Sequence, residues 1–172
     1  MIVLARFLGP SSFGGFAYAM TVAIFLGITV DYGYNLQVVK EISQFPEKIE
    51  EEVPKIFIAK TFLSAVALLG CIAFFLTEES TIGANIVVLT IAIIFQSFGQ
   101  FFFSVFRGLN RFKEETASTF ISHVMLLLLM VFIFWTRAGV IGIALVILLA
   151  RVAFFFYGIK TYLRYYRLSF ES

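Results

Sequence analysis

Residues 82–106 read IGANIVVLTIAIIFQSFGQFFFSVF, a long stretch without a single charged side chain. A helix needs about 20 predominantly apolar residues to cross the hydrocarbon core of a bilayer, and this stretch satisfies that requirement. Its apolar residues run continuously, whereas the strands of a membrane barrel alternate polar and apolar residues over about ten positions. The stretch therefore predicts a transmembrane α-helix.

The composition extends this prediction to the whole chain of 172 residues. Hydrophobic residues make up 60% and charged residues only 14%, against about 25% charged residues in a typical soluble domain. The chain holds 23 phenylalanines, more than one small aqueous core can hide. With one cysteine and one histidine, an intrachain disulfide is excluded and a protein-only zinc site is disfavoured. We expect an all-α membrane protein with no metal, no cofactor and no nucleic-acid partner.

Further segments have the length and composition of spanning helices, and together they form a single transmembrane domain over 1–172. The segment that precedes them, MIVLARF, is too short to cross a bilayer, and we expect it to be the end of an earlier helix. The predicted fold is a bundle of about five transmembrane helices plus this stub. The expected spans are 13–36, 56–76, 82–106, 116–136 and 138–159.

Lysine and arginine residues predict the orientation of the bundle. Segments 37–55 and 107–115 and the tail after 159 hold three of these residues each, whereas the opposite side holds only Arg6 and Arg137. Because basic loops stay in the cytoplasm, we expect these loops and the C-terminal tail to be cytoplasmic, in a multi-pass protein of the cell membrane. Within 41–55, EISQFPEKIEEEVPK suits either a short interfacial amphipathic helix or a charged loop interrupted by Pro46.

Charged and polar residues within the expected spans are candidate functional groups, because such side chains are costly at membrane depth. Lys60, His123 and Arg151 are candidate substrate-binding cations of one cavity. A helical rise of about 1.5 Å per residue places Arg151 roughly 13–14 Å from the cytoplasmic edge, close to the midplane. Lys60 has the alternative of snorkelling to the interface, and His123 that of a neutral interhelical hydrogen bond.

Four more polar residues are candidates for the cavity wall. Asp31 lies near the cytoplasmic end of its span, where it alternatively caps the helix or pairs with a cation. Gln96, Gln100 and Arg107 fall on roughly one face of their helix. This polar stripe suits a cavity lining, and glutamine equally joins helices to one another. Three glycines are expected at close-packing points instead: Gly27, Gly70 and Gly99.

Two motifs resemble those of the polysaccharide flippases of the O-antigen type, in the multidrug, oligosaccharidyl-lipid and polysaccharide exporter superfamily. In that family an Arg-x-Leu-Gly-Pro corner joins helices 1 and 2, helix 2 ends near Asp-Phe/Tyr-Gly, and Phe-Arg-Gly-x-x-Arg-Phe ends helix 4. The matching residues here are Arg6, Leu8, Gly9, Pro10, Phe13, Gly14, Asp31, Tyr32, Gly33, Phe106, Arg107, Gly108, Arg111 and Phe112.

The resemblance implies a two-bundle transporter of which this chain is most of the N-terminal half. It also implies the substrate, a lipid-linked oligosaccharide on a polyprenyl pyrophosphate carrier, flipped to the outer leaflet by alternating access for O-antigen and lipopolysaccharide biosynthesis. Polysaccharide polymerases and glycosyltransferases are the expected partners besides the bilayer. Alternatives are a multidrug or metabolite exporter of the same superfamily and a non-transporting scaffold subunit. A membrane-embedded enzyme is disfavoured, because the sequence lacks clustered Asp and His residues.

Overall fold

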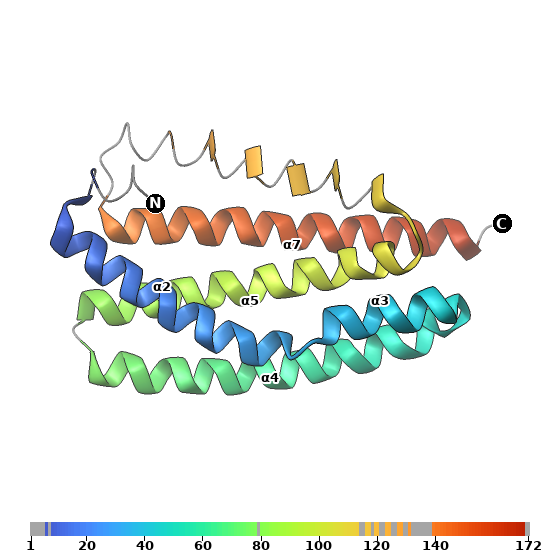
Figure 1. The fold of residues 1–172 in the computed structure, drawn as a ribbon, viewed down its shortest axis with the longest axis horizontal. Coiled ribbons are helices and arrows are strands. Elements are labelled where there is room, and N and C mark those ends of the chain that lie inside the picture. The colour runs from blue at the N-terminus through green and yellow to red at the C-terminus, as the bar shows by residue number, and fades with distance from the viewer. Residues whose placement is uncertain are drawn as a thin grey trace.

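The computed structural model describes residues 6, 8–78, 80–113, 116–117, 119–120, 123–124, 127–128, 131 and 139–170. All regular secondary structure in this part of the chain is helical, and the helices run along one another in a bundle (Figure 1). The elements are α2 (Pro10–Asp31), α3 (Tyr34–Gln44), the 3-10 helix η1 (Pro46–Lys48), α4 (Ile49–Thr77), α5 (Ser80–Gly108) and α7 (Val140–Phe170).

Four helical stretches of the described part are long and apolar enough to cross a membrane. They are Pro10–Gln44, Pro46–Thr77, Thr81–Gly108 and Val140–Arg164. These stretches confirm the prediction of an all-α membrane protein. The expected span 116–136 lies for the most part outside the described residues.

Helix α5 is the centre of the bundle and packs against α2, α3, α4 and α7 (Figure 1). Its contact with α7 is closest at Gly99, where a Cβ atom would lie 2.5 Å from Cδ1 of Phe154. Aromatic rings continue this contact on either side, with ring centroids 5.3 Å apart for Phe95 and Phe155 and 5.1 Å apart for Phe103 and Phe154. We call this contact the α5–α7 seam.

The other two glycines expected at close-packing points also lie against neighbouring helices. A Cβ atom at Gly27 of α2 would overlap the side chain of Ile93 on α5. At Gly70 of α4 it would lie 3.2 Å from Cδ2 of Leu26 on α2. Small residues at these positions let the backbones approach, which is how helices associate in lipid without a hydrophobic driving force.

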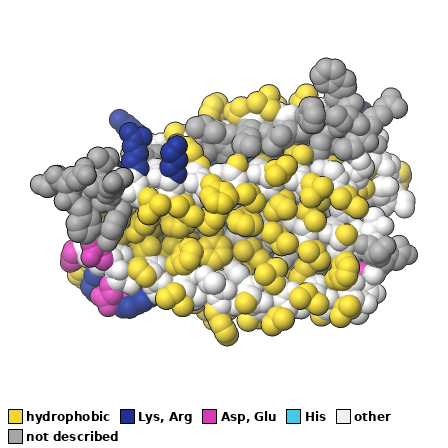
Figure 2. Space-filling model, turned by 180° about the vertical axis from the view of Figure 1, so that it is seen from behind, with side chains coloured by type: hydrophobic (Ala, Val, Ile, Leu, Met, Phe, Trp, Pro, Cys, Tyr) yellow, Lys and Arg dark blue, Asp and Glu magenta, His cyan; other side chains and the backbone are white. Residues whose placement is uncertain are grey.

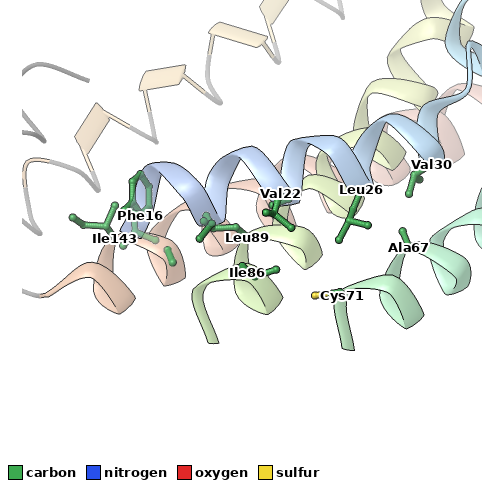
Figure 3. Close-up of a cluster of buried hydrophobic side chains, with 13 residues drawn as sticks. Phe16, Val22, Leu26, Val30, Ala67, Cys71, Ile86, Leu89 and Ile143 are labelled. Atoms are coloured by element: carbon green, nitrogen blue, oxygen red, sulfur yellow. The ribbon is translucent and has the colours of Figure 1, made fainter. Parts of the chain in front are cut away.

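The two larger apolar clusters of the interior lie one towards each end of the bundle, and a third, smaller cluster consists of Phe103, Phe106 and Phe154. The first joins α2, α4, α5 and α7 (Figure 3) and includes Phe16, Val22, Leu26, Val30, Ala67, Cys71, Ile86, Leu89 and Ile143. The second joins α3, α4 and α5 and contains Val38, Ile42, Val53, Ile56, Phe101, Phe102 and Val105. The segment between them holds the polar residues described below.

Within the expected span 13–36 the helix is interrupted, because α2 stops at Asp31 and α3 begins at Tyr34. Tyr32 (φ 30°) and Gly33 (φ 80°) both adopt left-handed backbone conformations, which interrupt a right-handed helix. The Tyr32 N–H still donates to Ile28 O at 3.1 Å and closes α2. The Gly33 carbonyl accepts from the N–H groups of Leu36 and Gln37, in the first turn of α3, and so starts the next helix.

Segment 41–55 matches neither alternative, since Pro46 interrupts it and both flanks are helical. The spacing nevertheless marks the core face: Ile42 and Val53 are buried, while Phe45 at the interruption is 42% exposed. The other helices also extend beyond the expected spans, α4 beginning at Ile49 and α7 continuing to Phe170. The reason is that a run of apolar residues indicates only the part of a helix that lies within the hydrocarbon core. The helical hydrogen bonding continues beyond that part into the charged interface.

The outer surface is apolar over most of its length. Large side chains such as Phe25, which is 69% exposed, point away from the bundle on α2 and α4. Figure 2 shows apolar side chains along the molecule and the described charged side chains gathered mainly at the end where α3 meets α4. An exposed apolar surface of this extent marks contact with lipid or with other protein.

The α2–α3 interruption predicts a specific sensitivity at Gly33. Replacing Gly33 with alanine forces a Cβ into the left-handed region and is expected to lower the free energy of unfolding by about 1–2 kcal/mol. The measurement is SDS-titrated unfolding of the full-length protein. Gly14→Ala is the control, because Gly14 lies in α2 without positive φ and with open space around its Cβ position. Equal effects of the two substitutions would contradict the assignment.

Candidate functional site

Four polar residues from four helices form a hydrogen-bonded layer around Lys60. The Lys60 side chain is fully buried, and its Nζ donates to Asp31 Oδ1 at 2.8 Å and to Ser97 Oγ at 2.8 Å. It also lies 3.4 Å from Asn35 Oδ1. Asp31 Oδ1 accepts two further bonds, from Asn35 Nδ2 at 2.7 Å and from Ser97 Oγ at 3.1 Å. We call Asp31, Asn35, Lys60 and Ser97 the polar layer.

The polar layer lies between the two apolar clusters, beside the interruption of α2 and α3. Breaking a buried ion pair leaves an uncompensated charge and is strongly destabilising. The layer therefore holds the end of α2 and the start of α3 against α4 and α5. Lys60 does not snorkel to the interface, and it lines none of the cavities described below. It pairs with Asp31 instead, so Asp31 pairs with a cation, which is one of the alternatives considered for it.

A cavity of about 420 Å³, which we call the arginine cavity, collects most of the other sequence candidates. Gln96, Gln100 and Arg107 reach it from successive turns of α5, and Arg151 reaches it from α7. The remaining lining residues are Asn35, Phe103, Ser104, Thr119, His123 and Phe154. The three α5 residues of the predicted polar stripe therefore lie in the lining of one cavity.

Arg151 is the cation best placed to meet a ligand. It is half-buried, and among the described residues no hydrogen bond or ion pair engages its guanidinium. His123 is exposed, and its Nδ1 lies 2.7 Å from Thr119 O one turn earlier, so that contact is not interhelical. Arg107 lies on the exposed face near the end of α5. A guanidinium that no protein group neutralises at membrane depth is a default functional candidate.

Two more cavities adjoin the arginine cavity. The aspartate cavity, of about 360 Å³, shares Gln96, Gln100 and Arg151 with it. Its other lining residues are Met20, Ile24, Gly27, Ile28, Asp31, Ile93 and Ser97. The lateral cavity, of about 550 Å³, shares Arg107, Thr119 and His123 with the arginine cavity and is completed by Thr116 and Phe120. The three cavities follow α5 from Ile93 to Arg107.

Sequence reasoning missed Asn35, Ser97 and Ser104. Asn35 follows Asp31 by one helical turn, but the interruption between them hides that relation. Ser104 follows Gln100 by one turn and donates to its carbonyl at 2.9 Å, so the α5 stripe could have been extended to it. Ser97 carried no signal of its own. Within the described part of the chain, no group of three His, Cys, Asp or Glu side chains is placed to hold a metal ion.

The chemistry of the arginine cavity suits an anionic ligand with polar substituents. A guanidinium donates to phosphate oxygens in a bidentate geometry. Carboxamides such as those of Gln96 and Gln100 both donate and accept, which suits hydroxyl groups. The cavity thus offers cationic and neutral polar groups in one lining.

The polar layer predicts a non-additive mutational cycle. Asp31→Asn leaves the fully buried Lys60 ammonium without a counter-charge and is expected to cost about 3 kcal/mol in unfolding free energy. Lys60→Met is expected to cost less, about 1–2 kcal/mol, because the remaining carboxylate is 41% exposed and solvent screens it. The double variant should cost less than the sum, with a coupling of about 1 kcal/mol or more. Strict additivity in SDS-titrated unfolding would contradict the pairing.

Comparison with known proteins identifies the group to which this sequence belongs. No curated protein and no solved structure matches the chain significantly. The family described as "Polysaccharide biosynthesis protein" matches residues 1–172, which is the whole sequence. Together with the apolar helical bundle, this match gives the conclusion that the chain is a multi-pass membrane protein that belongs to the polysaccharide biosynthesis protein family.

Proposed function

We propose that this protein is a flippase that moves a lipid-linked oligosaccharide from the cytoplasmic to the outer leaflet of the cell membrane. The observation that carries the proposal is Arg151, a half-buried guanidinium without a partner among the described residues, on the wall of the arginine cavity. Membership of the polysaccharide biosynthesis family supports a saccharide cargo. A polyprenyl pyrophosphate head group supplies the anion that Arg151 lacks.

In this proposal the arginine cavity binds the pyrophosphate. Arg151 donates to two phosphate oxygens, and Arg107 and His123 add donors from the far end of the same cavity. The amides of Gln96 and Gln100 form hydrogen bonds with the head group that water would otherwise form. The cargo crosses the membrane with its covalent bonds intact, so the protein is proposed to be a transporter and not an enzyme.

The polyprenyl chain is proposed to remain in the bilayer while the head group crosses. The lateral cavity supports this arrangement, because it shares lining residues with the arginine cavity and adds the apolar side chain of Phe120, which suits a lipid chain. Translocation then follows alternating access, in which one helical bundle rocks against another around a binding site near the midplane. The proposed partners are the glycosyltransferases that build the cargo and the polymerase that consumes it.

Arg151 provides the direct test. Arg151→Gln is expected to reduce flipping of a polyprenyl-pyrophosphate oligosaccharide by about 10- to 100-fold, because charge-assisted hydrogen bonds to the pyrophosphate are lost. Arg151→Lys should recover only part of the rate, since an ammonium cannot bind bidentately. The assay follows access of a lectin to the sugar in proteoliposomes that contain the full-length protein.

Arg164→Gln is the matched control for this assay. Arg164 lies on the same helix, is exposed, and lines none of the three cavities. The Arg164→Gln variant should flip the substrate at the wild-type rate. If Arg151→Gln flips normally, or if both variants lose activity equally, the guanidinium of Arg151 is not the head-group ligand.

The proposed orientation is tested by cysteine labelling. Lys48→Cys places an exposed thiol in η1, and Ser11→Cys places one at the opposite end, at the start of α2. The native Cys71 is buried and serves as an internal background. A membrane-impermeant maleimide added to intact cells should label position 11 and leave position 48 unlabelled, and inverted vesicles should reverse the pattern. The opposite result places the basic loops outside.

A further inference from the structure

We propose that the aspartate cavity is a saccharide subsite that binds a neutral or amino sugar next to the pyrophosphate, with the Asp31 carboxylate as hydrogen-bond acceptor. This inference rests on the proposed function and specifies where the sugar lies and which kind of sugar fits. It follows from an asymmetry in Asp31, from the mixed polar and apolar lining of the aspartate cavity, and from the residues that this cavity shares with the arginine cavity.

Asp31 uses only one of its two carboxylate oxygens inside the protein. Lys60, Asn35 and Ser97 all donate to Oδ1. Among the described residues Oδ2 receives no hydrogen bond, and the Asp31 side chain is 41% exposed while it lines the aspartate cavity. The polar layer therefore fixes the carboxylate in place and leaves one charged acceptor towards the cavity. An ionised carboxylate oxygen accepts from hydroxyl or ammonium donors.

The aspartate cavity combines polar and apolar lining residues on each of its two main helices. Helix α2 contributes Met20, Ile24, Gly27, Ile28 and Asp31, helix α5 contributes Ile93, Gln96, Ser97 and Gln100, and Arg151 comes from α7. A pyranose ring has hydroxyl groups at its edge and C–H groups on its faces, so it can contact both kinds of lining residue. The volume of about 360 Å³ also falls within the range of small-molecule sites, roughly 300–1,000 Å³.

The arrangement of charges assigns different parts of one ligand to the two cavities. Arg151, Gln96 and Gln100 line both of them. The first sugar is bonded directly to the pyrophosphate, so their binding sites must adjoin, as these cavities do. The negative charge of Asp31 repels phosphate from the aspartate cavity and disfavours an acidic sugar there. Lys60, which pairs with Asp31, and Arg151, which lines the same cavity, likewise disfavour a metal cation.

The test compares two lipids on the full-length protein in nanodiscs. One is a polyprenyl pyrophosphate that carries an oligosaccharide with a neutral first sugar, and the other is the same lipid without sugar. Asp31→Asn and Ile24→Trp should each weaken binding of the sugar-bearing lipid about tenfold, the first by removing the charged acceptor and the second by filling the cavity. Ile24→Trp should not change the affinity for the sugar-free lipid by more than about twofold.

Ile24→Trp keeps the test informative if Asp31→Asn destabilises the bundle, because Ile24 is not part of the polar layer. Phe25→Trp is its matched control, since Phe25 is the next residue of α2, is exposed, and lines none of the cavities. It should bind both lipids as the wild type does.

Each other outcome overturns the inference in a distinguishable way. If Ile24→Trp weakens both lipids equally or weakens neither, the aspartate cavity holds no sugar. If the wild type binds both lipids with one affinity, the saccharide subsite is refuted while the pyrophosphate site stands. If it binds neither lipid, the proposed function is refuted together with the subsite.

Discussion

The ion pair between Lys60 and Asp31 is the constraint on which the rest of the bundle depends. A fully buried ammonium requires a counter-charge and further acceptors, because lipid and apolar side chains offer neither. Asp31, Asn35 and Ser97 provide them, from the two sides of the α2–α3 interruption and from α5. The helical path can change at Tyr32 and Gly33 because the residues on either side of them are held to the same ammonium. The two apolar clusters then pack above and below this fixed point.

The same pair determines the electrostatics of the cavities. Asp31 pairs with Lys60 and forms no ion pair with Arg151, which remains a cation without a partner among the described residues. The buried pair thus gives Lys60 a structural role, whereas Arg151 stays available to bind a ligand. Two basic residues within apolar segments thus differ in their partners, and their roles differ accordingly.

The sequence predicted the membrane-spanning character and much of the polar face, because both depend on composition and local spacing. The residues of the α5 stripe, Gln96, Gln100 and Arg107, share one cavity as a helical period of about 3.6 requires. The role of Lys60 was not predictable in the same way. Its depth follows from counting residues, but its partner depends on the rotation of α4 against α2, which the evenly apolar α4 sequence does not specify. The left-handed conformation of Tyr32 was not evident from composition either, because tyrosine carries no preference for it, but the family resemblance placed the end of the helix near Asp31, Tyr32 and Gly33.

The α5–α7 seam also restricts how the protein can move. Where a glycine receives an aromatic ring, as Gly99 receives Phe154, sliding one helix along the other drives that ring into a neighbouring side chain. Helices α5 and α7 therefore behave as a single rigid block, and they carry Arg151, Gln96 and Gln100 together. In the proposed transport cycle the spacing of these three groups then stays constant. This block alone would then determine the affinity for a head group. The direction of transport would depend on the other helices, which open the cavity to one side of the membrane or the other.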